Sequence, residues 1–250
     1  CLSKYPIMLL AIDVGNTQIK LAVFEQNNIK IQKIVSLSSW KIEVQNILDF
    51  NDLIDNIVVS SVGHLDENEF KNITSKAKLN FITANSKFPF INSYTTPNTL
   101  GADRMVLAAG ATLLFPNQNR LVIDAGTCVT YDFVDSDNVY HGGAISPGIK
   151  LRYESLHNYT AKLPLLSPEY PDEIIGNSTL QSIHSGIING IIFEIDGFIS
   201  SIMDNNDNFI IILTGGDAEF LAKRLKNTIF ANSNFLLESL NQTFQYNHND

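Results

Sequence analysis

Asp13 stands at the end of an apolar run, residues 8–12, that indicates a strand buried on both faces. A carboxylate in that position is costly to desolvate unless a cation or several hydrogen-bond donors meet it. The polar turn 15–17 follows, and a second apolar run completes a β-hairpin at Phe24. Backbone N–H groups of such a turn can approach an anion. The hairpin therefore predicts a phosphate-and-metal site, with an aspartate that merely caps its own turn as the alternative.

The same pattern occurs a second time. Residues 123–127 match residues 12–16 in type, again after an apolar run and again before strand-like residues, here 129–134. Asp124 thus takes the place of Asp13, although it too could be a turn-capping residue. Because both halves open in the same way, we interpret the chain as duplicated. A later buried strand, 209–213, ends in Thr-Gly-Gly-Asp, which alone would indicate a plain strand-to-helix turn.

The remaining elements follow from hydrophobic periodicity, helix caps and turn residues. We expect further strands at 29–37, 57–62, 81–83 and 139–146, and helices at 40–50, 66–78, 101–115, 149–158, 179–203 and 218–226. Strands that alternate with helices indicate an α/β fold with some parallel pairing.

Composition narrows the functional classes. The 250 residues suffice for two domains, and 44% hydrophobic content is typical of a globular protein. A net charge of −9 argues against nucleic acid and anionic membranes as partners. The apolar run 187–202 is interrupted by polar residues, so we expect no membrane span.

The cysteines and the N-terminus suggest where the protein works. Cys1 and Cys128 lie too far apart in sequence to indicate a disulfide framework or a cysteine-rich zinc site. A reducing cytoplasm fits them, and we find no signal-peptide pattern. We interpret residues 1–7 as an extension or a cloning remnant.

Two halves that each open with a strand, Asp-x-Gly and a return strand, resemble the actin-like ATPases and sugar kinases. The resemblance implies a duplicated ribonuclease H-like fold of two α/β half-domains with mixed sheets, here 8–118 and 119–250. It also implies an ATP cleft between the halves, with the two hairpins at the phosphates and the late Gly-Gly turn near the adenosine.

Five further stretches resemble those of type III pantothenate kinases. They cover 13–20, 100–104, 142–148, 160–164 and 179–186. The match runs from Met8 to about Leu225. It implies an enzyme that uses ATP to phosphorylate pantothenate, the first committed step towards coenzyme A.

Asp103 and Arg104 open a predicted helix, where exposed N–H groups favour a carboxylate and an anionic ligand. From the residues alone, a helix-start acid and a solvated arginine remain an alternative. The resemblance implies that Asp103 is the base for the pantothenate hydroxyl. It also implies a set of substrate-binding residues: Tyr94, Gly101, Ala102, Asp103, Arg104 and Thr179. Thr179 would in addition suit the N-cap of the long helix.

The resemblance also implies the ATP and metal contacts. Asp124 would bind a monovalent cation, K⁺ or NH₄⁺, and Thr127 the phosphates. Asp13 would face Mg²⁺ through water, since Mg²⁺ keeps several waters. The ATP-binding stretch would comprise Asp13, Val14, Gly15, Asn16, Thr17, Gln18, Ile19 and Lys20.

Two other functional classes stay open: a non-catalytic regulatory paralogue, and another actin-like small-molecule kinase. A Walker-type site is excluded because its glycine-lysine pattern is missing from the sequence. The resemblance further implies a homodimer with the pantothenate pocket at the subunit interface. Independently, the isoleucine-rich helix 183–202 covers more than one face with apolar side chains. Such a helix is either enclosed in its own domain or shared with a second subunit.

Overall fold

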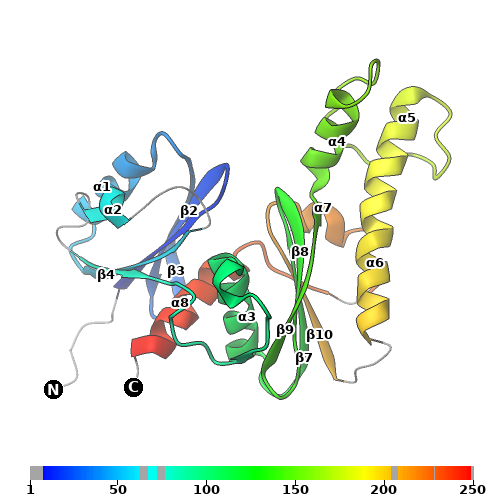
Figure 1. The fold of residues 1–250 in the computed structure, drawn as a ribbon. Helices are drawn as coiled ribbons and strands as arrows, with labels where there is room; N and C mark the ends of the chain where they lie inside the picture. The colour runs from blue at the N-terminus through cyan, green and yellow to red at the C-terminus, as the bar shows by residue number, and fades with distance from the viewer. Residues whose placement is uncertain (1–7, 62–66, 72–76, 204–207, 228, 249–250) are drawn as a thin grey trace. The chain divides into compact units, whose positions relative to one another are not determined.

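The computed structural model describes residues 8–61, 67–71, 77–203, 208–227 and 229–248 (Figure 1). The predicted extension 1–7 lies outside them. The chain forms two compact units, one of residues 1–114 with 234–250 and one of residues 115–233. The boundary near residue 118 stays a prediction for the half-domains, but the segment 234–250, assigned by sequence to the second half, packs with the first unit.

The first unit contains a mixed sheet in the order β3-β2-β1-β4-β5. Its central strand pairs antiparallel with one neighbour and parallel with the other. Leu10, Ala11 and Ile12 of this strand have no exposed surface, as an apolar run buried on both faces predicts. The strands are β1 Met8–Val14, β2 Gln18–Glu25, β3 Asn28–Ser36, β4 Ile54–Ser61 and β5 Lys78–Phe81.

Helices cover both faces of this sheet. Trp40 and Phe70, from α1 and α2, pack ring to ring at 4.6 Å over one face. The predicted helix 66–78 is shorter than expected where described, since Lys78 already begins β5; residues 72–76 lie outside the described part. The elements are α1 Trp40–Asp49, α2 Glu67–Lys71, β6 Ile91–Asn92, the 3₁₀ turn η1 Pro97–Thr99, α3 Ala102–Leu114 and α8 Phe235–His248.

Helix α8 was not expected from the sequence. It packs on α3 so closely that a Cβ on Gly110 would lie 2.8 Å from the Cα of Ser239. Side-chain amides also tie it to loops of the same unit: Asn247 exchanges two hydrogen bonds with the backbone of Lys87 at 3.0 and 3.1 Å. These contacts explain why the C-terminal segment belongs to the first unit.

The second unit repeats the arrangement of the first, as the duplicated motif predicts. Its strands run in the order β11-β10-β7-β8-β9, and β7 pairs antiparallel with β8 and parallel with β10. The strands are β7 Asn119–Ala125, β8 Cys128–Val134, β9 Val139–Pro147, β10 Phe209–Thr214 and β11 Phe230–Ala231.

A long helix lies along one face of this sheet (Figure 1). It consists of α5 Thr179–His184, a π-helical turn η2 Ser185–Asn189 and α6 Gly190–Met203. Two shorter helices accompany it, α4 Ile149–Asn158 and α7 Ala218–Ala222, the latter ending before the predicted residue 226.

The isoleucines of the long helix are buried within their own unit. They form one core with the sheet and with partly buried residues of α4 and the following loop, among them Leu156, Leu163 and Tyr170. The buried set is Ile183, Ile187, Ile188, Ile191, Ile192, Ile195 and Ile199. The inference of a second subunit from these isoleucines is therefore withdrawn. By length and composition alone the helix Thr179–Met203 could cross a membrane, but core helices meet the same criteria, and its isoleucine face packs in a core.

Candidate functional site

Asp13 lies near the end of β1 and is 6% exposed. It stands abreast of Lys20 in β2 and of Ser60 in β4. The turn after β1 is closed by a hydrogen bond of 3.1 Å from the Gly15 N–H to the Gln18 carbonyl. A buried carboxylate thus stands near the end of the central strand, next to a short turn.

The polar turn residues of the predicted ATP-binding stretch are accessible. Asn16, Thr17 and Gln18 are exposed, whereas Val14 and Ile19 are buried in the core of the sheet. The side chains of Val14 and Ile19 therefore hold the hairpin in place. A phosphate could reach only their backbone groups.

Asp124 has the matching position in the second unit. It stands abreast of Thr130 in β8 and of Thr214 in β10. A hydrogen bond of 2.9 Å from the Gly126 N–H to the Cys128 carbonyl closes the next turn, in which Thr127 is exposed. The second aspartate is thus again followed by a tight, accessible turn.

Gly215 packs directly against Asp124. Its φ is +96°, and a Cβ there would lie 2.4 Å from Asp124 Oδ1 and 2.2 Å from the Ala125 carbonyl oxygen. Only glycine adopts this conformation readily and leaves the space that the carboxylate occupies. The late Gly-Gly turn therefore helps to set the position of Asp124.

Hydroxyl groups beside both aspartates were missed by sequence reasoning. The side-chain oxygens of Ser60, Thr130 and Thr214 are buried and meet no hydrogen-bond partner among the described residues. Residues abreast in neighbouring strands share a face of the sheet, so these oxygens belong to the surroundings of Asp13 and Asp124. Ser60 and Thr214 lie at strand ends beside an aspartate strand, and that position was the available signal.

The oxygen-rich surroundings fit cations of the predicted kinds. Mg²⁺ takes oxygen ligands and usually one or two carboxylates, which suits Asp13. At Asp124, the carboxylate and two neighbouring hydroxyls offer only oxygen. In the described part of the chain, no three His, Cys, Asp or Glu side chains form a metal-binding cluster. A cation here would accordingly take most of its ligands from water and substrate.

A third group of predicted residues meets at the start of α3. The Arg104 N–H donates a hydrogen bond of 2.9 Å to Asp103 Oδ1. The Arg104 guanidinium lies 5.8 Å from the centre of the Tyr94 ring and is largely buried. Gly101 and Ala102 are partly buried at the same helix end. The structure thus brings Tyr94 and residues 101–104 together.

Burial raises the pKa of the Asp103 carboxyl above its ordinary value, against the opposing effects of the Arg104 N–H and the Arg104 charge. A carboxylate with a raised pKa is a stronger base than a solvated one. Asp103 thus combines a position at a helix start with increased basicity.

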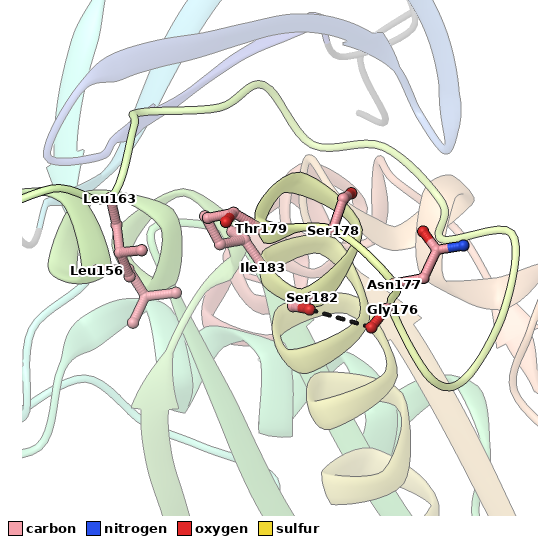
Figure 2. Close-up of a pocket in the computed structure, with 8 residues that line it drawn as sticks. All are labelled: Leu156, Leu163, Gly176, Asn177, Ser178, Thr179, Ser182 and Ile183. Atoms are coloured by element: carbon pink, nitrogen blue, oxygen red, sulfur yellow. Dashed lines mark hydrogen bonds between the residues drawn. The ribbon is translucent and has the colours of Figure 1, made fainter.

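Thr179 lies at a hollow of about 690 Å³ in the second unit (Figure 2). Leu156, Leu163 and Ile183 form its apolar part, and polar groups of 176–179 and Ser182 line the rest. Ser182 donates a hydrogen bond of 3.3 Å to the Gly176 carbonyl. Thr179 does not cap the helix, because the N-cap is Ser178, whose side chain accepts from the Gln181 N–H at 3.3 Å. Thr179 is instead exposed and lines the hollow.

Comparison with known families decides the identity of the chain. The sequence profile of the type III pantothenate kinases matches residues 9–201. The chain belongs to this family. A type III pantothenate kinase of Flavobacterium psychrophilum is 60% identical and covers 96% of this chain and 99% of its own length. That of Flavobacterium johnsoniae is 58% identical, with 96% and 98% covered.

Solved structures place this pantothenate kinase family member in its fold class. A glucokinase from an Antarctic psychrotroph superposes with a TM-score of 0.53 at 12% identity, covering 97% of this chain and 99% of its own. A ROK family protein of Streptococcus pneumoniae, in complex with sucrose, gives 0.52 at 12% identity, with 97% and 99% covered. At such identities the likeness concerns the fold alone. With the two mixed sheets, it confirms the predicted duplicated actin-like fold.

Gly215 offers a sharp test of the second site. Gly215→Ala should lower the free energy of unfolding by about 1–3 kcal/mol, because the added methyl group meets both a strained φ and the Asp124 carboxylate. Gly216→Ala is the matched control, since a Cβ there meets no atom within 4 Å. Urea unfolding of both variants measures the difference. Equal losses would show that the close approach to Asp124 does not matter.

Proposed function

We propose that this chain transfers the terminal phosphate of ATP to the primary hydroxyl of pantothenate, giving 4′-phosphopantothenate for coenzyme A synthesis. The observation that carries the proposal is the start of α3, where a basic carboxylate, a guanidinium and an aromatic ring meet. Membership of the family supports the choice of substrate.

Asp103 takes the proton of the attacking hydroxyl. Its pKa is raised by burial, and general bases work best when their pKa lies nearer the operating pH than that of a solvated carboxyl. Arg104 binds the carboxylate of pantothenate, because a guanidinium offers two parallel N–H groups to such a ligand. Tyr94 orients Arg104 through the ring contact, and Gly101, Ala102 and Thr179 complete the substrate contacts.

The two aspartate hairpins act on ATP. Residues 13–20 and Thr127 bind its phosphates, while Asp13 faces Mg²⁺ through water and Asp124 binds K⁺ or NH₄⁺. The cations supply charge neutralisation of the polyphosphate. The protein's own contribution is positioning, which is the main source of catalysis in phosphoryl transfer.

An ADP-release assay with and without pantothenate tests this function. ADP release that depends on pantothenate, with one phosphate transferred per ADP, is the expected result. Release with other alcohols but not with pantothenate would favour another small-molecule kinase. ATP binding without any release would favour a non-catalytic paralogue.

Asp103→Asn should lower turnover by roughly 10²- to 10⁴-fold, because asparagine is nearly isosteric but a far weaker base. ATP binding should stay unchanged, which calorimetry can check. Turnover like that of the wild type would remove Asp103 from the role of base.

The role of Asp103 as base also predicts how activity depends on pH. Since Asp103 must be deprotonated to act, kcat/KM of the wild-type protein should fall as the pH drops through a pKa above the ordinary 3.8. This acid limb should disappear in Asp103→Asn. A limb that is identical in both proteins would assign it to another group.

Activity should require K⁺ or NH₄⁺, and Asp124→Ala should abolish both this dependence and most of the activity. The reason is that Asp124 is the carboxylate of an oxygen-lined strand end, beside the exposed Thr127 turn. Initial rates in KCl, NH₄Cl and NaCl at equal ionic strength measure the effect. Equal rates in sodium and potassium would count against the assignment.

We also propose a homodimer in the cytoplasm, with the hollow beside Thr179 at the subunit interface. Exposed apolar side chains support the proposed interface. Ile174 and Ile175 precede the lining segment 176–179 in the sequence and Leu180 follows it, while Phe193 lies further along the long helix. Light scattering should give twice the chain mass of 27.8 kDa, and Leu180→Asp should shift it towards the monomer. An active wild-type monomer would refute the dimer and the shared pocket together.

A further inference from the structure

Glu194 on α6 joins three other elements of the second unit. Its carboxylate accepts hydrogen bonds from Tyr131 of β8 at 2.8 Å, from Ser146 of β9 at 2.5 Å and from Arg152 of α4 at 2.6 Å. Ser146 belongs to the stretch 142–148, to which the proposed mechanism gives no role. The side chains of Arg152 and Glu194 are only 19% and 24% exposed.

In this network Glu194 stays ionised and Tyr131 stays protonated around neutral pH. Burial opposes ionisation of Glu194, but the hydrogen bonds from Ser146, Arg152 and Tyr131, together with the Arg152 charge, outweigh it and lower the pKa of the carboxyl. Burial and the neighbouring Glu194 raise the pKa of Tyr131, so the phenol keeps its proton and remains a donor. Around neutral pH the network is therefore a carboxylate held by three donors.

Arg152 extends the network to a backbone turn. Its Nε donates a hydrogen bond of 2.8 Å to the Pro147 carbonyl, while its Nη2 is engaged by Glu194. The next residue, Gly148, donates its N–H to the Thr127 carbonyl at 3.0 Å. A series of contacts thus runs from Glu194 through Arg152 and residues 147–148 to the turn 126–127.

The last contact in this series is a close approach of two backbone segments. A Cβ on Gly148 would lie 2.0 Å from the Gly126 carbonyl oxygen and 2.6 Å from that of Thr127. The two backbones therefore rest on each other with no side chain between them. A shift of the 147–148 segment would move the 126–127 turn with it.

We propose that Glu194 and Arg152 are positioning residues that hold the 126–127 turn in the geometry that binds the ATP phosphates. The proposal rests on the proposed function, which assigns Thr127 to the phosphates. Neither side chain needs to touch ATP: the charge of Arg152 is compensated by Glu194, and two of its nitrogens are occupied. Supporting residues of this kind act because small misplacements of a binding group weaken transition-state contacts.

Glu194→Gln tests the role, since it keeps the size of the side chain but removes the charge that holds Arg152. We expect KM for ATP to rise roughly 10- to 100-fold, with KM for pantothenate unchanged. Arg152→Lys should act in the same direction, because an ammonium cannot reproduce the fork that joins Pro147 to Glu194. Glu154→Gln is the matched control: Glu154 pairs with Lys150 on α4 at 3.6 Å, outside the network, and should leave both KM values unchanged.

A direct binding measurement separates this inference from the proposed reaction. Calorimetry with a non-hydrolysable ATP analogue, Mg²⁺ and KCl but no pantothenate should show the same loss of affinity in Glu194→Gln. If the wild-type protein binds the analogue but fails to phosphorylate pantothenate, the proposed function is wrong while a weakened Glu194→Gln still supports the positioning role. Wild-type affinity in Glu194→Gln would overturn the inference. It would equally be overturned if only the unfolding midpoint fell, with ATP affinity intact below that temperature.

Discussion

A carboxylate at the end of a buried central strand is the constraint on which both units depend. Strands β1 and β7 are covered on both faces, so a charge inside either would be very costly. At the strand end, polar residues of the neighbouring strands stand abreast of it: Lys20 and Ser60 beside Asp13, Thr130 and Thr214 beside Asp124. Since a slip of one residue would turn each aspartate to the opposite face, the sheet register itself specifies the site.

Close backbone packing serves the same end in the second unit. Gly215 and Gly148 both lie where a Cβ would collide, the first with Asp124 and the second with the 126–127 turn. Side chains at these positions would separate the strand ends and the turns. The approach of backbone segments thus explains why Gly215 and Gly148 are glycines. Glu194 and Arg152 contact the segment around Gly148 from the helices.

The sequence predicted most strands, both hairpins and the α/β class, because these follow from local patterns of apolar and turn residues. Helix α8 was missed because its segment contains Asn, Thr, Phe and Tyr, which are average or poor helix formers, and its helical state depends on α3 and the first sheet. The packing of α8 on the first unit depends on tertiary contacts, which no local sequence pattern indicates. The inference of a second subunit from the isoleucines of the long helix failed for a related reason. The sequence shows that more than one face of the helix is apolar, but not that α4 and the loop after it cover the apolar face that the sheet does not contact. Likewise, the grouping of Tyr94 with Arg104 came from the family resemblance, since no local pattern links these two residues on either side of the turn η1.

The charge distribution explains why a protein of net charge −9 would need cations to bind ATP. Carboxylates near a polyphosphate repel it unless a positive charge lies between them. Arg152 cannot supply that charge, because Glu194 compensates it at 2.6 Å. Arg104 is largely buried beside Tyr94 and is assigned to the carboxylate of the other substrate. Among the residues proposed to bind the phosphates, Lys20, abreast of Asp13, is the one with a positively charged side chain, and the N–H groups of the two turns add only partial charges. A divalent ion at Asp13 and a monovalent ion at Asp124 would turn both aspartates from sources of repulsion into ligands, and this electrostatic argument supports the proposed cation requirement.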